Sequence, residues 1–451
     1  MKKMKHDVPT RLVKVLNLIL MMVAFGFVWY GYYAARAQVH YYRRGDWVVI
    51  LLFGILYYGF CRSYDAFHIS ISPISEIIYS QTLALIISDF IMYVVIWLLS
   101  LYMPNAVPLL ITFGVQFLIS VLWTFLGHQW YFHNFRPGRT AVIYDLREGM
   151  ESLVGEYGME KKFHIEKVLG VEECLAKLSV LDEMDTVFLS GIHSHERNII
   201  LKYCMYQDIQ VYVIPRIGDV IMGGAKKVHM FHLPMLRIDR YRPIPEYTIA
   251  KRAFDILFSG IAIVIASPFM LVTAIAIKSD GGPALYKQKR LTKDGKEFNV
   301  LKFRSMRVDA EKDGVARLST GDKDDRITPV GKVIRKIRFD ELPQLFNILR
   351  GDMSIVGPRP ERPEIARQYE EEMPEFRLRL QAKAGLTGYA QVYGKYNTTP
   401  YDKLLMDLTY IGTPSLWEDF KICLATVKIL FMPESTEGVA EGATTAMNGK
   451  K

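Results

Sequence analysis

The chain has 451 residues, of which 50% are hydrophobic and 23% are charged, and its mean hydropathy is +0.11. This apolar content excludes a disordered, collagen-like or low-complexity protein, because such chains lack the side chains that build a core. The 56 lysines and arginines outnumber the 47 acids. Beside long apolar runs, this basic excess favours anionic lipid or phosphorylated small molecules as partners over nucleic acid.

Four long apolar segments occupy the first 134 residues and predict transmembrane helices. Val15–Tyr33 and Ala106–Gly127 carry no charge over 19 and 22 residues, enough to cross about 30 Å of hydrocarbon. The other two are Trp47–Cys61 and Ile77–Met103, and the latter contains Asp89, for which we expect a packing or interfacial role. Basic residues before the first segment favour a cytoplasmic N terminus: Lys2, Lys3, Lys5, Arg11 and Lys14.

Residues 135–245 alternate short apolar runs with helical stretches, the pattern of a parallel sheet with crossover helices. The apolar runs are Thr140–Tyr144, Asp185–Leu189 and Ile209–Ile214, and the helical stretches are Val171–Leu178 and His195–Tyr206. The first run is followed by Asp145-Leu146-Arg147-Glu148-Gly149 and lacks the GxGxxG that lets a backbone approach a dinucleotide phosphate. We therefore expect a small Rossmann-like α/β domain with an interaction, regulatory or spacer role.

A fifth apolar segment, Ile256–Ile277, has 22 uncharged residues and contains Ser267-Pro268 near its middle. Proline removes a helix hydrogen bond and clashes with the preceding turn, so we expect a sharp bend. The length allows a straight span, whereas a bend allows a re-entrant helix that enters and leaves the same leaflet. The residues alone leave both arrangements open. Beyond this segment we expect a mixed α/β domain and, over 433–451, a disordered tail.

The stretch Tyr286–Met306 holds seven lysines and arginines against two acids. Next to a membrane-embedded helix, it suits anionic head groups or a lipid phosphate. A solvated basic hairpin around Asp294-Gly295 is the alternative.

Two neighbouring acids, Asp340 and Glu341, precede Pro343. Proline is tolerated only in the first turn of a helix, so we expect a helix to begin near Asp340, with the apolar face Leu342, Leu345, Phe346 and Leu349. Two carboxylates at a helix N terminus, with basic residues just upstream (Lys332, Arg335, Lys336 and Arg338), indicate a metal-assisted phosphate site. The alternative is an N-cap Asp followed by an ordinary Glu.

Arg359 lies between Pro358 and Pro360. The two prolines stiffen the backbone and reduce the entropy lost when the guanidinium is positioned, and arginine suits bidentate recognition of phosphate. A turn with a structural arginine is the alternative.

Six motifs that follow one another over about residues 248–432 carry a resemblance to a known family. They are Lys251-Arg252-Ala253-Phe254-Asp255, Ser267-Pro268, Lys302-Phe303-Arg304-Ser305-Met306, Asp340-Glu341-Leu342-Pro343-Gln344, Val356-Gly357-Pro358-Arg359-Pro360 and Gly385-Leu386-Thr387-Gly388. Together they resemble the bacterial sugar transferases, the monotopic phosphoglycosyl transferases that start cell-surface glycan assembly. With the preceding spans and α/β domain, the whole chain resembles the long form, typified by undecaprenyl-phosphate galactose or glucose phosphotransferases.

The resemblance implies roles for particular residues. Asp340 matches the nucleophile and Glu341 its neighbour in binding Mg²⁺. Arg359 is expected to hold a phosphate of a nucleotide-sugar, and Arg304 and Arg338 are further expected phosphate-binding residues. Asp407 matches a further acid of the family, whose role stays open.

The resemblance also implies an organisation and a reaction. Ser267 and Pro268 match the break of a re-entrant helix, which keeps both soluble parts cytoplasmic at a bacterial inner membrane. The expected regions are a transmembrane region over 1–134, an α/β domain over 135–245, a mixed α/β catalytic domain over 246–432 with a re-entrant helix over 252–278, and a tail over 433–451. The expected reaction transfers a sugar phosphate from a UDP-sugar to undecaprenyl phosphate through an aspartyl intermediate.

Two other functions stay open at this point. One is a membrane-anchored scaffold or regulator of polysaccharide export with an inactive transferase domain. The other is a glycosyltransferase that moves only the sugar, for which Asp322-Lys323-Asp324 is a DxD-like metal site or a solvated charge run. The sequence identifies neither the sugar nor the glycan, and it leaves a homodimer open.

Overall fold

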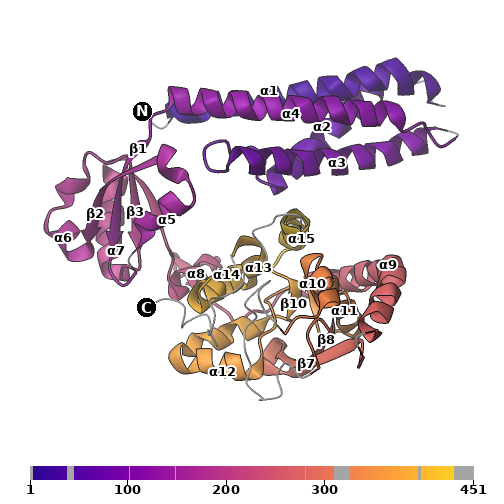
Figure 1. Cartoon of the computed structure of the whole chain (residues 1–451). Helices are drawn as coiled ribbons and strands as arrows, with labels where there is room; N and C mark the ends of the chain where they lie inside the picture. Colours follow the sequence, from indigo (N-terminus) through magenta and orange to yellow (C-terminus); the bar gives the residue numbers. More distant parts are fainter. Residues whose placement is uncertain are drawn as a thin grey trace. The chain divides into compact units, whose positions relative to one another are not determined.

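A computed structural model of the chain describes residues 4–37, 45–100, 102–147, 149–279, 281–308, 326–394 and 398–430. It divides into two compact units, Met1–Ile214 and Pro215–Lys451 (Figure 1). The expected tail over 433–451 and the DxD-like sequence Asp322–Asp324 lie outside the described residues.

The first unit begins with four helices that coincide with the predicted apolar segments. They are α1 (Met4–Val28), continued by the turns η1 (Trp29–Tyr33) and η2 (Ala34–Arg36), α2 (Gly45–Ser63), α3 (Ile74–Leu99) and α4 (Val107–Asn134). All four are long and apolar enough to cross a membrane, and only 28–39% of their most apolar windows is buried in the protein. Helices that expose apolar side chains over most of their surface in this way indicate a membrane-associated protein.

A chain of polar side chains joins the four helices in the interior of the bundle. The Gln81 Oε1 atom accepts hydrogen bonds from Ser120 Oγ at 2.7 Å and Asn17 Nδ2 at 3.4 Å, and Gln81 Nε2 donates to the Ala66 carbonyl at 3.2 Å. Tyr57 donates to Asn17 Oδ1 at 2.9 Å. Asp89 is buried as well, but neither of its carboxylate oxygens has a hydrogen-bond partner among the described residues.

Gln81 and Asp89 should therefore respond differently to substitution. We expect Gln81→Leu to lower the free energy of unfolding by about 1–3 kcal/mol, because buried groups on Asn17 and Ala66 lose their partner. Asp89→Asn keeps the side-chain shape and removes an unpaired buried acid, so it should leave the stability unchanged or raise it. Thermal unfolding in detergent micelles measures both. An Asp89→Asn loss as large as that of Gln81→Leu would contradict this prediction.

The second part of the first unit is a four-stranded parallel sheet with strand order β2-β1-β3-β4. The strands are β1 (Gly138–Tyr144), β2 (Phe163–Gly170), β3 (Thr186–Ser190) and β4 (Gln210–Val213), and the helices are α5 (Met150–Glu156), α6 (Val171–Ala176) and α7 (Ser194–Tyr206). Side chains of β1 alternate: Ala141 and Ile143 pack with α6 and α7, whereas Val142 packs with α5. The predicted parallel α/β fold is thus confirmed, and β2 is an additional strand.

The second unit opens with α8 (Ile217–Gly223) and the hairpin of β5 (Lys226–Met230) and β6 (Leu233–Arg237). The end of α8 meets α14 (Pro400–Gly412) so closely that a Cβ atom on Gly224 would lie 2.8 Å from the Gly412 Cα. Residues 215–245, which the sequence pattern placed with the α/β domain, therefore belong to the second unit.

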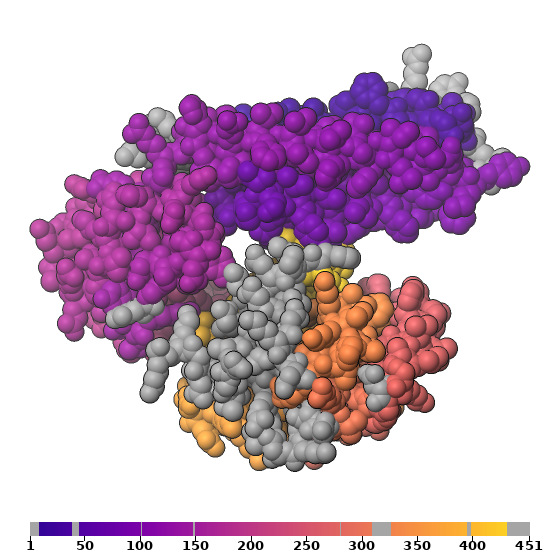
Figure 2. All heavy atoms as spheres, viewed as in Figure 1, coloured from indigo at the N-terminus to yellow at the C-terminus, as the bar shows by residue number. Residues whose placement is uncertain are grey.

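The long helix α9 (Pro245–Lys278) carries the fifth apolar segment and continues through Ser267 and Pro268. Pro268 has no amide proton for the Val264 carbonyl, four residues before it, and the Ser267 hydroxyl donates to that carbonyl at 2.8 Å instead. Only 17% of the most apolar window of α9 is buried, and the helix lies at the surface of its unit (Figure 2). Re-entry of α9 into one leaflet stays a prediction.

Polar side chains in the first half of α9 attach the helix to the rest of the second unit. Arg252 donates to the carbonyls of Ile348 and Leu349 at 2.6 and 2.7 Å, at the end of α11 (Gln344–Arg350). The Asp255 carboxylate accepts from the backbone N–H of Ile355 at 2.9 Å. Lys251 forms an ion pair with Asp419 at 2.8 Å. The apolar helix is therefore fixed to the elements that carry the predicted site.

The remaining elements form a compact mixed α/β core around these attachments. They are the antiparallel strands β7 (Leu285–Leu291) and β8 (Glu297–Phe303), α10 (Pro329–Lys336), the parallel strands β9 (Ser354–Val356) and β10 (Gly385–Thr387), α12 (Pro363–Glu372), the turn η8 (Pro374–Gln381), α13 (Tyr389–Tyr393) and α15 (Leu416–Leu430). Val356, Phe376, Leu404, Leu408 and Ile422 are fully or almost fully buried in its largest cluster.

Candidate active site

Asp340 and Glu341 lie in a tight turn, η7 (Phe339–Glu341), between α10 and α11. Arg338 adopts a left-handed conformation with φ of 55°, and the amides of Glu341 and Leu342 bond three residues back, as in a 3₁₀ turn. The helix predicted near Asp340 begins only at Gln344, because the residues after the left-handed Arg338 form this tighter turn first. The expected apolar face also differs: Ile348 is buried, whereas Phe346 is 39% exposed.

The strand β8 brings a lysine to this turn. Asn347 of α11 accepts from the Leu301 amide at 2.9 Å and donates to the Asn299 carbonyl at 2.9 Å, so α11 is bound to β8. Lys302 on the same strand then donates to Glu341 Oε1 at 3.0 Å. The sequence left open whether the basic residues of Tyr286–Met306 form a solvated hairpin. Lys302, at least, points into the site.

Glu341 accepts from a second cation, Arg359, whose Nη2 atom lies 3.2 Å from Glu341 Oε1. Burial on its own would raise the pKa of Glu341, but the positive charges of Lys302 and Arg359 outweigh it and hold this pKa well below its usual range. Glu341 is thus an ionised carboxylate at neutral pH. Its charge neutralises part of the positive charge next to Asp340.

Asp340 has no hydrogen-bond or ion-pair partner for its carboxylate in the part of the chain that the structure describes. Burial and the negative charge of Glu341 raise the pKa of Asp340, against the opposing charges of Lys302, Arg335 and Arg359. An unpaired carboxylate surrounded by cations is suited to attack the phosphorus of a negatively charged phosphate group, because the cations reduce the repulsion between the two anions.

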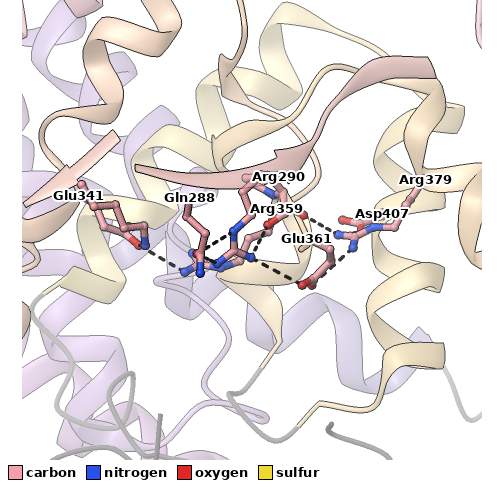
Figure 3. A network of polar contacts seen from close by, with 9 residues as sticks. Gln288, Arg290, Glu341, Arg359, Glu361, Arg379 and Asp407 are labelled. Carbon is pink, nitrogen blue, oxygen red and sulfur yellow. Dashed lines mark hydrogen bonds and ion pairs between the residues drawn. The ribbon is translucent and has the colours of Figure 1, made fainter. Parts of the chain in front are cut away.

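Arg359 is 45% exposed and projects from the loop that joins β9 to α12. Its backbone lies next to a buried group of charged residues. Arg379 forms an ion pair with Asp407 at 2.7 Å and contacts Glu361 at 3.5 Å, and Arg290 lies 4.0 Å from Glu361. Figure 3 shows the row that runs from Glu341 through Arg359 and Glu361 to Asp407.

The donor set at the turn fits a magnesium ion. Mg²⁺ prefers oxygen ligands and is usually held by one or two carboxylates together with substrate phosphates and waters. Asp340 and Glu341 supply two carboxylates, and the Asp340 oxygens are unpaired among the described residues. The described residues hold no group of three or more His, Cys, Asp or Glu that would bind a metal without a substrate. Asp340 and Glu341 would therefore hold the ion together with phosphate.

The other predicted residues lie in different surroundings. The charge of Arg338 contributes to the low pKa of Glu341, so Arg338 is close to the site. Asp407 is buried against Arg379. The Arg304 guanidinium is buried and donates to the Ile277 carbonyl at the end of α9 at 3.0 Å. Binding of phosphate by Arg304, Arg338 and Arg359 stays a prediction, as does the break at Ser267 and Pro268.

Four charged residues of this region were not predicted as part of the site: Arg290, Lys302, Glu361 and Arg379. Arg290 and Lys302 were noted only as basic residues of the Tyr286–Met306 stretch, and Glu361 follows the Pro-Arg-Pro motif directly. These three were therefore within reach of motif analysis. Arg379 belongs to none of the motifs, and only the folded chain brings it to Arg359.

Comparison with known proteins places this site in a family. A family model described as bacterial sugar transferase matches residues 246–433. A UDP-glucose:undecaprenyl-phosphate glucose-1-phosphate transferase of Caulobacter vibrioides is 40% identical over 201 residues, which are 43% of this chain and 74% of that protein. The chain belongs to the bacterial sugar transferase family.

Two further relatives match this sugar transferase over only about half of their own length. A UDP-N-acetylgalactosamine-undecaprenyl-phosphate N-acetylgalactosaminephosphotransferase of Aeromonas hydrophila is 40% identical over 234 residues, 51% of this chain and 54% of that protein. An undecaprenyl-phosphate galactose phosphotransferase of Salmonella typhimurium is 38% identical over 236 residues, 49% of each chain. The chain thus spans about half the length of these two relatives, whose names differ in the sugar.

Proposed function

We propose that this sugar transferase moves a sugar phosphate from a nucleotide diphosphate-sugar, with a UDP-hexose as the expected donor, to undecaprenyl phosphate, and that it releases the nucleoside monophosphate. The observation that carries the proposal is the unpaired Asp340 carboxylate beside Glu341, Lys302 and Arg359. The names of the relatives support the acceptor, because each names undecaprenyl phosphate. The product would begin the assembly of an exopolysaccharide, a capsule or an O-antigen.

In the first step, a carboxylate oxygen of Asp340 attacks the phosphorus next to the sugar. A bond forms between this oxygen and the phosphorus, and the bond that joins the two phosphates breaks. The leaving oxygen takes the electron pair, and the nucleoside monophosphate departs. Arg359 and Lys302 offset negative charge on the two phosphates, with Glu341 holding both cations next to Asp340.

In the second step, a phosphate oxygen of the polyprenyl phosphate attacks the same phosphorus. The bond to Asp340 breaks, the carboxylate is restored, and the lipid carries a sugar diphosphate. Two half-reactions through a covalent intermediate predict ping-pong kinetics. Asp340 needs no proton transfer in either half-reaction, because it acts as a carboxylate at the start and at the end.

Magnesium fits this chemistry through Asp340 and Glu341. When bound, the ion would supply a positive charge that offsets the phosphate charge and orients the leaving group. We therefore expect chelation of divalent ions to stop turnover and added Mg²⁺ to restore it.

The membrane helices support a place for the reaction at the bacterial inner membrane. We propose that the first four apolar helices cross it and that α9, with its Ser267-Pro268 pair, enters and leaves the cytoplasmic leaflet. Both soluble parts would then face the cytoplasm. A site attached to α9 through Arg252 and Asp255 meets a soluble donor and a lipid acceptor at the membrane surface.

A donor screen tests the function. The purified full-length protein in detergent is incubated with undecaprenyl phosphate and one UDP-sugar at a time, and the nucleotide and the lipid product are identified by mass spectrometry. We expect one donor or a few to give UMP and undecaprenyl diphosphate-sugar. Release of UDP with a lipid monophosphate-sugar would instead indicate a transferase that moves only the sugar. No product with any nucleotide-sugar would favour the membrane-anchored scaffold.

A further inference from the structure

The segment Pro358–Glu361 is held entirely by other parts of the protein. Pro358 and Pro360 have no amide protons, so neither can donate a backbone hydrogen bond that would stabilise a turn within the segment. Each of its four carbonyls accepts a hydrogen bond from a different residue. The donors are the Gly385 amide for Pro358 at 2.9 Å, Arg379 Nη2 for Arg359 at 2.9 Å, Arg290 Nη1 for Pro360 at 3.0 Å and the Leu291 amide for Glu361 at 3.0 Å.

Arg379 is the most firmly held of these donors. Its side chain is only 4% exposed and lies over the Phe376 ring, 4.9 Å from the ring centre. Its Nε and Nη2 atoms both contact Asp407 Oδ2, at 2.8 and 2.7 Å, and Asp407 is 1% exposed. A planar guanidinium held by a carboxylate has a fixed direction for its remaining N–H groups.

One of those remaining N–H groups reaches the Arg359 carbonyl, and Nη1 lies 3.5 Å from Glu361 Oε1. Arg379 therefore binds the segment at two points, the Arg359 carbonyl before Pro360 and the Glu361 carboxylate after it. The Arg359 side chain leaves the segment in the direction of Glu341, which it meets at 3.2 Å. The backbone of Arg359 is thus fixed from the buried side, while its guanidinium is half-exposed to a ligand.

We propose that Arg379, oriented by Asp407, is a positioning residue for Arg359: it holds the Arg359 carbonyl and thereby sets where the Arg359 guanidinium meets the diphosphate of the donor. This inference rests on the proposed function of the site. It assigns Asp407 an indirect role, because Asp407 contacts Arg379 and lies beneath the segment that carries Arg359.

A double-mutant cycle on the full-length protein tests the proposal. The variants are Arg359→Lys, Arg379→Lys and the double variant, with Asp407→Asn as an independent disturbance of the same contact. Binding of UDP by calorimetry, the KM for the UDP-sugar and for undecaprenyl phosphate, and the melting temperature are measured for each. UDP binding does not depend on turnover, so this readout remains if the proposed reaction is wrong.

We expect Arg379→Lys to weaken UDP binding and raise the donor KM about tenfold, because a single ammonium cannot bind Asp407 and the Arg359 carbonyl with the same geometry. The KM for undecaprenyl phosphate should stay the same. Asp407→Asn should change the same two constants in the same direction. In the double variant, UDP binding should be no weaker than with Arg359→Lys alone, because Arg379 acts through the Arg359 guanidinium, which Arg359→Lys has already removed.

Arg252→Lys is the matched control. Arg252 also donates to two backbone carbonyls, those of Ile348 and Leu349, but it holds no part of the Pro358–Glu361 segment. It should lower the melting temperature without a selective change in UDP binding.

The proposal is overturned if the loss of UDP affinity in the double variant equals the product of the losses in Arg359→Lys and Arg379→Lys. It is also overturned if Arg379→Lys and Asp407→Asn change only the melting temperature. An inactive wild type that still binds UDP would overturn the proposed reaction but not this positioning.

Discussion

Replacing Asp340 with asparagine should lower the rate of nucleoside monophosphate release at least about a thousandfold, because an amide cannot form the bond to phosphorus that a carboxylate oxygen forms. The same substitution should leave the melting temperature unchanged or raise it, since burial already disfavours the charged form of Asp340. Loss of activity in a folded protein of full stability is therefore the expected pattern. Release of UMP from a UDP-sugar in the absence of acceptor measures the first half-reaction.

Intact-mass analysis adds a direct readout of the covalent step. The wild-type protein, quenched with its donor in the absence of lipid acceptor, should gain the mass of one sugar phosphate, and Asp340→Asn should gain none. Asp239→Asn is a matched control, because Asp239 is an exposed carboxylate paired with Arg237 on the surface of the same unit. A variant at Asp340 that retains a tenth or more of the wild-type rate would rule out Asp340 as the nucleophile.

Replacing Glu341 with glutamine should lower kcat about a hundredfold and raise the Mg²⁺ concentration for half-maximal rate at least about tenfold. Glutamine keeps the shape of the side chain but removes the charge that Lys302 and Arg359 share. It should also lower the free energy of unfolding by about 1–3 kcal/mol, because the Lys302 ammonium, 21% exposed, loses its anion. A Mg²⁺ titration of UMP release and thermal unfolding measure the two effects.

A compensating substitution separates the two effects of Glu341→Gln. In Lys302→Met/Glu341→Gln both charges are gone, so stability should return toward the wild type while activity stays low. The stability difference between the wild type and Glu341→Gln should be the same at pH 6 and pH 8. The pKa of Glu341 is held low, so its contribution is complete above the ordinary glutamate pKa of about 4.3 and is lost only as the pH falls below it. Full activity in the double variant would contradict a role for Glu341 in the reaction.

Apolar runs predicted much of the fold. Strands β1 and β3 are buried on both faces and leave a continuous signal, β4 coincides with the apolar run Ile209–Ile214, and each of the four N-terminal helices coincides with an apolar segment. Strand β2 (Phe163–Gly170) escaped prediction. Like β4 it is an edge strand, but charged residues lie between its apolar ones, whereas the run that contains β4 has no charge, and a charged alternating stretch is a weaker signal than an apolar run.

The site was predictable only where its residues are neighbours in the sequence. Asp340, Glu341 and Arg359 stand out because each lies beside prolines or other charges within a few residues. The contacts of Glu341 with Lys302 and of Arg379 with Asp407 join residues 39 and 28 positions apart. Such pairings depend on how β8, η8 and α14 pack, and no local pattern encodes that packing. The helix start was misplaced by four residues because Arg338 adopts a left-handed conformation that sequence analysis did not anticipate.

The Ser267 hydroxyl in α9 makes Pro268 tolerable in a helix that exposes most of its surface. If α9 enters the membrane as proposed, no water is present there to satisfy the Val264 carbonyl, so an alanine at position 267 would leave that oxygen without a donor. An alanine at position 268, in contrast, would restore an amide donor and make the hydroxyl redundant. Serine and proline at this point are therefore interdependent, and a chain that lost the serine first would pass through a less stable intermediate than one that lost the proline first.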